Sequence, residues 1–142
     1  MEQTLVNGIA DNLLHNIFND LSVGLELYDK DGLMIDVNYS RLRSMGIKDK
    51  KDILGHNLFN YTSFSDEIKE QIRKGETVRF VAKYDFDALR RLFPTYLSGT
   101  KYFEITVSFV HNEKSEVTNY MVITQDVTER VLWQNKYDNL YE

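Results

Sequence analysis

The chain has 142 residues, of which 42% are hydrophobic and 27% are charged, and its formal net charge is −5 at pH 7. A chain of this length and composition is typical of one globular domain with a core of its own. The 17 basic residues are outnumbered by 22 acidic ones and form no basic block, which argues against nucleic-acid binding. The absence of cysteine excludes disulfides, thiolate metal ligands and thiol nucleophiles.

Signals for membrane insertion and secretion are not found in the sequence. No stretch approaches the roughly 18 consecutive apolar residues that a membrane-spanning helix needs. The first residues, MEQTLVNGIADNLL, are acidic where a secretory signal would be basic. We therefore expect a cytoplasmic location and no direct membrane contact by this segment.

An amphipathic helix is predicted from Thr4 to Asn19, because large apolar residues recur there at every fourth position. We assign residues 1–20 to this helix and interpret it as a cap or dimerisation element. The expected surface of a homodimer is its apolar stripe, formed by Leu5, Ile9, Leu13 and Ile17.

The next stretch, VGLELYDKDGLMIDVN, alternates apolar and polar residues around DKDG and predicts a β-hairpin. This alternation assigns Leu25 and Leu27 to the interior. Asn38 is expected to cap a short helix, YSRLRSMG, which Gly46 ends. A clearer helix, SDEIKEQIRKG, begins after the cap Ser65 and ends before a glycine.

Three runs in the second half alternate in the manner of strands, namely TVRFVAKYDF, KYFEITVSFVH and VTNYMVITQDV. The connection between the first two, residues 87–100, is too long for a tight hairpin, and we interpret it as an ordered surface insertion or as a lid over a site. The element order predicts an α+β fold: a five-stranded antiparallel sheet with short helices on one face, flanked by N- and C-terminal amphipathic helices.

Three strings make the chain resemble the PAS domain family, namely VGLELYDKDGLMIDVNYSRLRSMG, DILGHNLFN and YMVITQDVTER. Asp29, Gly32 and Asn38 occupy the places of the family's front hairpin, D-x-x-G followed by x-N. The closing D-[IV]-T-E-R of the family is matched by residues 126–130. The resemblance covers residues 17–130 and implies a PAS core over 21–128, with the insertion at 87–100.

The resemblance implies a sensory module of a larger signalling protein, a bacterial two-component sensor or regulator. The sheet and its helices would enclose a pocket for an unidentified small molecule. A change there would pass to an effector domain in the same polypeptide through a C-terminal signalling helix, of which residues 129–142 form the start. The expected signal junction is Asp126, Thr128, Glu129 and Arg130, in which Asp126 and Glu129 have the spacing of a capping box.

The sequence leaves the cofactor unknown. The light-sensing branch of the family forms a flavin adduct through a cysteine, and Leu58 stands at that place in GHNLFNY, so a covalent flavin adduct is excluded. Haem is not expected, because the helix SDEIKEQIRKG contains no histidine to serve as an axial ligand. His15, His56 and His111 lack the spacing of metal ligands, and no metal site is expected.

The predicted ligand pocket is the set of residues that the alternation turns inward, together with Tyr96 of the insertion. Most of them would form the core whether or not a ligand binds, whereas a buried tyrosine or glutamine would need a hydrogen-bond partner. The set consists of Leu25, Leu27, Leu42, Met45, Phe59, Phe64, Ile72, Phe80, Tyr84, Tyr96, Phe103, Ile105, Val107, Ile123 and Gln125.

Two other functions stay open beside the ligand sensor. The first is a ligand-free dimerisation or protein-interaction module whose interior is filled by its own side chains. The second, more remote, is a small α+β enzyme that uses Asp85, Asp87 or His111. The sequence contains no Gly-rich phosphate loop and no Ser-His-Asp arrangement, so we expect a domain that is not itself an enzyme.

Overall fold

The computed structural model describes the backbone of residues 2–61 and 64–141, while the side chains of residues 2–7, 9 and 141 lie outside this description. Over these ranges the chain forms five strands, two long terminal helices and several short helices between them. In chain order the elements are α1 (Glu2–Asp20), β1 (Gly24–Asp29), β2 (Met34–Val37), α2 (Tyr39–Met45), η1 (Lys50–Asp52), η2 (Leu58–Asn60), α3 (Asp66–Arg73), β3 (Val78–Asp85), α4 (Phe86–Leu89), β4 (Thr100–His111), β5 (Val117–Asp126) and α5 (Thr128–Tyr141).

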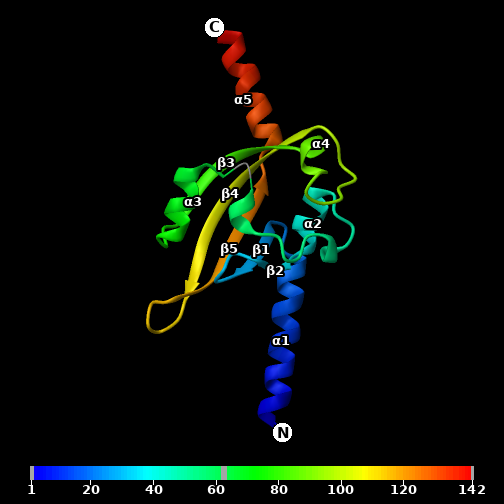
Figure 1. Cartoon of the computed structure of the whole chain (residues 1–142). Helices are drawn as coiled ribbons and strands as arrows, with labels where there is room; N and C mark the ends of the chain where they lie inside the picture. Colours follow the sequence, from blue (N-terminus) through cyan, green and yellow to red (C-terminus); the bar gives the residue numbers. More distant parts are fainter. Residues whose placement is uncertain (1, 62–63, 142) are drawn as a thin grey trace.

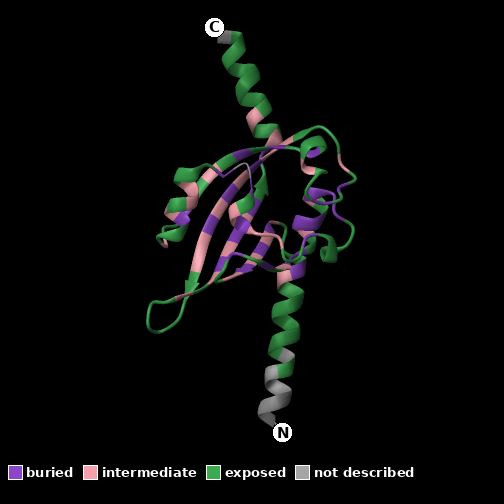
Figure 2. Ribbon diagram, in the orientation of Figure 1, coloured by how far each residue is buried: buried purple, intermediate pink, exposed green. Residues whose placement is uncertain are grey.

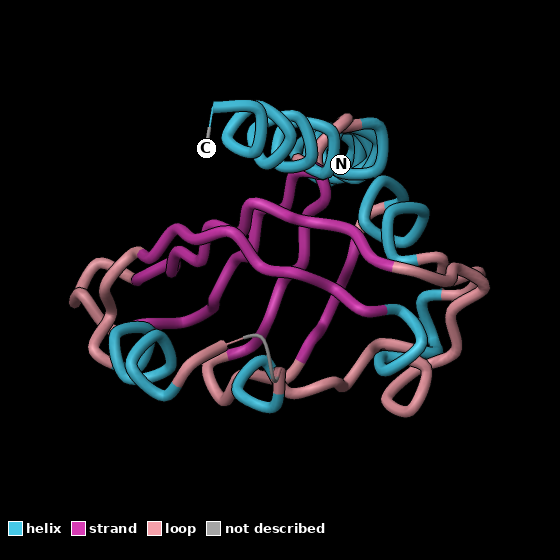
Figure 3. Tube along the Cα trace, turned by 90° about the horizontal axis from the view of Figure 1, so that it is seen from above, coloured by secondary structure: helices cyan, strands magenta, loops and turns pink. Residues whose placement is uncertain are grey.

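The five strands form one antiparallel sheet in the spatial order β2-β1-β5-β4-β3. The strand β5 therefore lies at the centre, between β1 and β4. Viewed from above, both terminal helices lie on one side of the sheet, and α3 lies on the opposite side (Figure 3). The predicted α+β class and the five-stranded antiparallel sheet are confirmed.

The terminal helices extend away from the sheet in opposite directions (Figure 1). Most of their described residues are exposed, in contrast to the sheet and α2 (Figure 2). Leu13 in α1 is 57% exposed and Trp133 in α5 is 69% exposed, so large apolar side chains of both helices face solvent. An isolated helix has little stability in water without packing. Of their described residues, only those at the C-terminal end of α1 and the N-terminal end of α5 pack against the domain.

Local sequence signals account for the short elements. The side chain of Asn38 accepts a hydrogen bond from the backbone N–H of Arg41, which caps α2 as predicted. Gly46 ends α2 at φ +67°, a left-handed conformation that favours glycine. The Ser65 side chain likewise caps α3 by accepting a bond from the N–H of Ile68.

The predicted faces of β1 and β5 are wrong. Glu26 and Tyr28 are buried on the inner face of β1, whereas Leu25 and Leu27 are half-buried on its outer face. A shift of one residue reverses every side chain of a strand, so hydrophobicity alone misassigned the set. Two physical reasons explain the reversal. The charge of Glu26 is neutralised inside by Arg41, and the two leucines border an outer groove that α1 also lines.

The same reversal moves Ile123 and Gln125 of β5 to the outer side. Val122 and Thr124 face the interior instead and are 2% exposed each, while Gln125 is exposed. Ile123 is half-buried and lies in the register opposite Leu25 of β1, so both residues share the outer face. The expectation that Gln125 would reach an interior ligand is therefore wrong.

The insertion at residues 87–100 is an ordered segment that packs on the end of α2. It starts with the single turn α4, and its later part is joined to the chain at Gly46 by a hydrogen bond of 2.9 Å from the N–H of Tyr96. The hydroxyl of Thr95 donates to the carbonyl of Met45 at 2.6 Å. Phe86 and Phe93 are 0% and 3% exposed and anchor the segment in the core.

Candidate functional site

A buried ion pair lies in the interior between the sheet and α2. Arg41 Nε is 2.6 Å from Glu26 Oε2, and both side chains are 1% exposed. Glu26 reaches this position because it alternates with Gly24 and Tyr28 on the inner face of β1, and Arg41 lies in the first turn of α2, three residues after the cap Asn38. Two charges removed from water require close pairing and further hydrogen bonds, and the neighbouring tyrosines supply them.

Three tyrosine hydroxyls surround the ion pair. The Tyr28 hydroxyl donates to Glu26 Oε1 at 2.5 Å and lies 3.4 Å from the Tyr61 hydroxyl, and Arg41 Nη2 donates to the Tyr84 hydroxyl at 3.2 Å. Burial, together with the charge of Glu26, raises the pKa of Tyr28 and Tyr61 well above the usual value, so both remain neutral donors. We call Glu26, Tyr28, Arg41, Tyr61 and Tyr84 the polar cluster.

The guanidinium of Arg41 also stacks on aromatic rings. Its Cζ lies 5.3 Å from the ring centroid of Tyr84 and 5.0 Å from that of Phe103. Burial by itself would lower the pKa of Arg41, but the Glu26 carboxylate, together with Tyr84 and Tyr61, outweighs burial and raises the pKa, so the group stays charged. Within the described residues Arg41 Nη1 has no hydrogen-bond partner, so its N–H groups can donate to a further acceptor.

His56 lies beside the polar cluster. Its ring centroid is 4.8 Å from that of Tyr61 and 6.1 Å from that of Phe93. Its Nε2 is buried and lacks a hydrogen-bond partner in the described part of the chain. Burial lowers the pKa of His56, an effect that the charge of Glu26 partly opposes, and the imidazole is therefore neutral at pH 7.

We expect acidification to destabilise the domain through His56. Because its pKa is lower in the folded than in the unfolded state, the unfolded chain binds more protons below the ordinary histidine value of about 6.5. The contribution to stability is present above that pH and is lost as pH falls toward the folded pKa. Urea unfolding of wild type and His56→Phe at pH 7.5 and 5.5 measures it. A His15→Phe variant, altered on the exposed part of α1, is the matched control. An equal pH dependence in wild type and His56→Phe would contradict the assignment.

Most of the predicted pocket residues lie in the interior. Leu42, Met45, Phe64, Ile72, Tyr84, Phe103, Ile105 and Val107 are buried, and Phe59 and Phe80 are half-buried against them. Tyr96 is 58% exposed, on the surface of the insertion, and does not face the interior. The sequence reasoning missed the residues that give the interior its polarity, Glu26, Tyr28, Arg41 and Tyr61. Only the period of two through Gly24, Glu26 and Tyr28 could have revealed part of this set.

Asn38 connects α2 to the base of α1. Its side-chain Nδ2 donates to the carbonyls of Phe18 and Val23 at 2.9 and 3.0 Å. Its Oδ1 accepts from the N–H of Leu25 at 2.9 Å and from that of Arg41 at 3.1 Å. The residue is 0% exposed, so this single amide holds together the end of α1, the start of β1 and the start of α2.

The junction between β5 and α5 is fixed to β4. The N–H of Val127 donates to the carbonyl of Tyr102 at 2.9 Å, and the N–H of Tyr102 donates to Thr128 Oγ1 at 3.0 Å. Asp126 Oδ1 accepts from the N–H of Thr128 at 2.9 Å, a contact at the first helical residue rather than the predicted capping-box geometry. Val127 is 7% exposed, so α5 begins on a buried anchor.

Charged side chains on the outer face add a second attachment of α5. Glu104 of β4 pairs with Arg79 of β3 at 2.6 Å and with Arg130 of α5 at 3.4 Å. Lys101 lies 3.7 Å from Asp126 at the helix start. The two arginines are largely exposed whereas Glu104 is 16% exposed, and pairs that solvent reaches contribute little to stability while still favouring one direction of the helix.

The residues of the enzyme alternative do not converge. Asp85 accepts bonds from the backbone of α4, Asp87 pairs with Arg90 at 3.1 Å, and His111 is exposed at the far end of β4. The described residues include no group of three or more side chains suited to hold a metal ion. In that same part of the chain, no helix has the length and apolar character needed to cross a membrane.

Comparison with solved structures shows which known fold the chain has. No protein-family model and no curated protein matches the chain. Among solved structures, an RNA-binding light-oxygen-voltage receptor has a TM-score of 0.75 and 22% identity, and the match covers 95% of this chain but 38% of that one. The PAS domain of an HTR-like protein from Haloarcula marismortui matches with a TM-score of 0.65 and 16% identity, over 88% of this chain and 98% of that one. A PAS domain from a two-component sensor histidine kinase matches with a TM-score of 0.62 and 15% identity, over 84% and 98%. The chain therefore has the PAS fold.

Proposed function

We propose that the chain is the sensory and signal-relay domain of a larger signalling protein, a two-component sensor or regulator. In this proposal the polar cluster is the sensing site and α5 is the output element. The PAS fold and the similarity to sensory domains support the proposal, and the connection from the polar cluster to α5 carries it. The effector would be attached beyond α5, in the same polypeptide.

The connection runs through one residue of β4. The guanidinium of Arg41 stacks on Phe103, and Phe103 is the partner of Asp126 in the β4–β5 register. The preceding residue, Tyr102, bonds Val127 and Thr128 at the start of α5. A change in the position of Arg41 would therefore displace the β-strand residues that fix the direction of the output helix. Coupling of this kind requires two arrangements of the same contacts, which the buried ion pair can provide by opening and closing.

A small-molecule signal is favoured by two buried nitrogens. Arg41 Nη1 and His56 Nε2 have no partner among the described residues, and a ligand that bonds both would remove the free-energy cost of leaving them unpaired. The ligand-free module is the second candidate, and a different observation favours it. Arg41, Tyr28, Phe86, Phe103 and Met45 are among the largest fully buried side chains, so side chains already fill much of the interior.

The test of the proposal is made in the full signalling protein. Replacing both members of the ion pair by apolar residues, Glu26→Leu with Arg41→Met, removes the charges without leaving either one unpaired. We expect the domain to fold and the output to lose its response to the signal. The exposed pair on α3, Arg73→Met with Glu70→Leu, is the matched control, because it lies outside both the polar cluster and the attachments of α5. An unaltered response in the Glu26→Leu/Arg41→Met protein would refute the role of the polar cluster.

Asp126→Ala is expected to weaken the start of α5. Loss of the bond to the N–H of Thr128 should cost about 1 kcal/mol of helix stability, as for other capping residues. Helix content near residue 128 can be followed by NMR chemical shifts, and output by the activity of the full protein. Asp138→Ala, near the exposed end of α5, is the control. If the output activity of the full protein were the same in Asp126→Ala and wild type, the junction would be only a connector between the domain and the effector.

We also propose that α1 forms a homodimer. Leu13 and Ile17 are 57% and 47% exposed, and they continue a predicted stripe whose other members, Leu5 and Ile9, lie outside the described side chains. A second copy of the helix is the simplest cover for an exposed apolar stripe, because two such stripes can bury one another.

Removal of residues 1–16 is expected to produce a folded monomer. Sedimentation velocity measures the mass, and circular dichroism reports whether the sheet persists. The point variants Leu13→Glu with Ile17→Glu should act as the truncation does, whereas Asn12→Glu with Asn16→Glu adds the same charges beside the stripe and should leave the dimer intact. A truncated chain that remains dimeric would show that another surface holds the copies together.

A further inference from the structure

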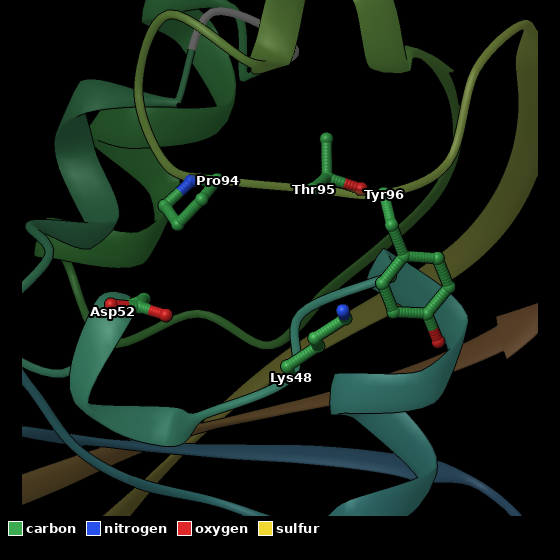
Figure 4. Close-up of a pocket in the computed structure, with 6 residues that line it drawn as sticks. Lys48, Asp52, Pro94, Thr95 and Tyr96 are labelled. Carbon is green, nitrogen blue, oxygen red and sulfur yellow. The ribbon is translucent and has the colours of Figure 1, made fainter.

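A surface pocket lies between the insertion and the connection that follows α2. It has a volume of about 230 Å³ and is lined by Gly46, Lys48, Asp52, Pro94, Thr95 and Tyr96. Lys48 and Asp52 border it on one side and the segment from Pro94 to Tyr96 on the other (Figure 4). None of these residues belongs to the polar cluster, so the pocket is a separate feature of the domain.

The wall formed by the insertion is fixed in place. The Thr95 hydroxyl donates to the carbonyl of Met45 and accepts from the N–H of Leu97 at 3.1 Å, and Thr95 is 8% exposed. Arg90 Nε donates to the carbonyl of Thr95 at 3.3 Å. A Cβ on Gly46 would lie 2.6 Å from both Leu97 Cγ and Thr95 Oγ1, so only glycine permits this close approach. The pocket therefore exists before any ligand binds.

The two charged residues that line the pocket have opposite sign and do not meet. Their neighbours on the same loop form ion pairs, Lys50 with Asp36 at 3.4 Å and Lys51 with Asp49 at 3.5 Å. Lys48 and Asp52, by contrast, form no ion pair within 4.0 Å in the part of the chain that the structure describes. An ammonium and a carboxylate thus border the same cavity, each available to a charged ligand.

We propose that this pocket binds a free α-amino acid. Its carboxylate would pair with the Lys48 ammonium, its ammonium would pair with the Asp52 carboxylate, and its side chain would contact Pro94 and the ring of Tyr96. Both contacts are charge-assisted hydrogen bonds, the stronger kind. A simple anion or cation would satisfy one protein charge and leave the other unpaired. The volume of about 230 Å³ is smaller than the about 300–1,000 Å³ of pockets for drug-sized ligands, which favours a ligand as small as one amino acid.

A bound amino acid would act at the end of α2. Gly46 and the carbonyl of Met45 hold the insertion against that helix, and the same helix carries Arg41 of the polar cluster. Occupation of the pocket would reinforce the contact between the insertion and α2. The binding itself does not rest on the proposed sensory function, and it can be measured on the 142-residue chain alone.

The test is an NMR titration of the isotope-labelled chain with each of the 20 common L-α-amino acids. We expect at least one to give saturable shifts at the amides of Lys48, Asp52 and Tyr96. Acetate and methylammonium at the same concentrations should leave these amides unchanged. Lys48→Met and Asp52→Asn should each weaken the binding about tenfold or more, the usual effect of removing one charged hydrogen-bond partner.

Matched controls lie on the same loop. Lys51→Met and Asp49→Asn alter an exposed ion pair outside the pocket and should bind as the wild type does. Because all four positions are exposed, each variant should fold, and its amide spectrum confirms this. The proposal is overturned if no amino acid gives saturable shifts up to about 10 mM, a concentration above that of any specific complex of useful strength. It is equally overturned if acetate binds as well as the amino acid or if the control variants lose binding to the same extent.

Discussion

Replacing Arg41 by alanine is expected to lower the free energy of unfolding by about 3–5 kcal/mol, because the change leaves Glu26 as a buried charge without its partner. It also removes a side chain that stacks on Tyr84 and Phe103 and fills the interior. Urea denaturation followed by circular dichroism gives the value. A loss below about 1 kcal/mol would be the size expected for an exposed pair and would contradict the burial of this one.

Two further variants separate charge from packing. Glu26→Leu with Arg41→Met should recover most of the loss, because a buried ion pair replaced by apolar residues of similar volume is often neutral or stabilising. Arg79→Ala removes the exposed member of the pair with Glu104 and should cost about 1 kcal/mol or less. If the double variant were as unstable as Arg41→Ala, packing and not the unpaired charge would be the cause.

Replacing Asn38 by alanine is expected to cost about 3 kcal/mol or more. Four backbone groups, two N–H donors and two carbonyl acceptors, lose their partner, and each buried group left unpaired costs about 1–3 kcal/mol unless water reaches it. The change should also release the base of α1, so the amides between Phe18 and Val23 should exchange with solvent faster. Denaturation and hydrogen exchange measure the two effects.

The control for Asn38 is another capping asparagine. Asn57 caps η2 by accepting one bond from the N–H of Phe59 at 2.9 Å, and Asn57→Ala should cost about 1 kcal/mol. Asn38→Asp keeps the acceptor and replaces the donor by an oxygen that faces two carbonyls, so it should be nearly as destabilising as alanine. Equal costs for Asn38→Ala and Asn57→Ala would show that Asn38 is an ordinary cap and not a junction between three elements.

The sequence predicted the parts of the fold that short-range chemistry determines. Asn38, Gly46 and Ser65 mark helix ends because capping and left-handed backbone need particular residue types within a few positions. The alternation in β3 and β4 assigned Tyr84 and Ile105 to the interior, where both are buried. These features can be predicted because cause and effect lie close together along the chain.

The features that the sequence did not predict depend on contacts between distant segments. Glu26 and Arg41 each resemble a solvated surface residue, and only the packing of α2 on β1 shows that they neutralise one another. Because a charged residue was assumed to face solvent, the neighbours Leu25 and Leu27 were placed inside. Gln125 was misplaced in the same way, since Thr124 is the inward residue at that end of β5. Tyr96 was assigned to the predicted pocket because its hydroxyl could bond a ligand, whereas the insertion places this residue on the surface.

The polar cluster differs from an ordinary core in the number of arrangements open to it. An apolar core has one dense packing, while an ion pair with a free nitrogen on Arg41 can exchange one partner for another. Both terminal helices are bonded to elements that border this interior. Asn38 bonds the end of α1 to the start of α2, and Tyr102 bonds the start of α5 to β4. A response at Arg41 can therefore reach both terminal helices.

Hydrogen exchange at the start of α5 tests the central claim most directly. The N–H groups of Tyr102 and Val127 both form hydrogen bonds across the junction, and both residues are far along the chain from Glu26 and Arg41. In the Glu26→Leu/Arg41→Met chain, we predict that these two amides exchange at least about tenfold faster relative to wild type, a shift of about 1.4 kcal/mol in local opening, while Val107, farther along β4, is unchanged. Unchanged exchange at Tyr102 and Val127 in a folded variant would contradict the coupling of the polar cluster to the output helix.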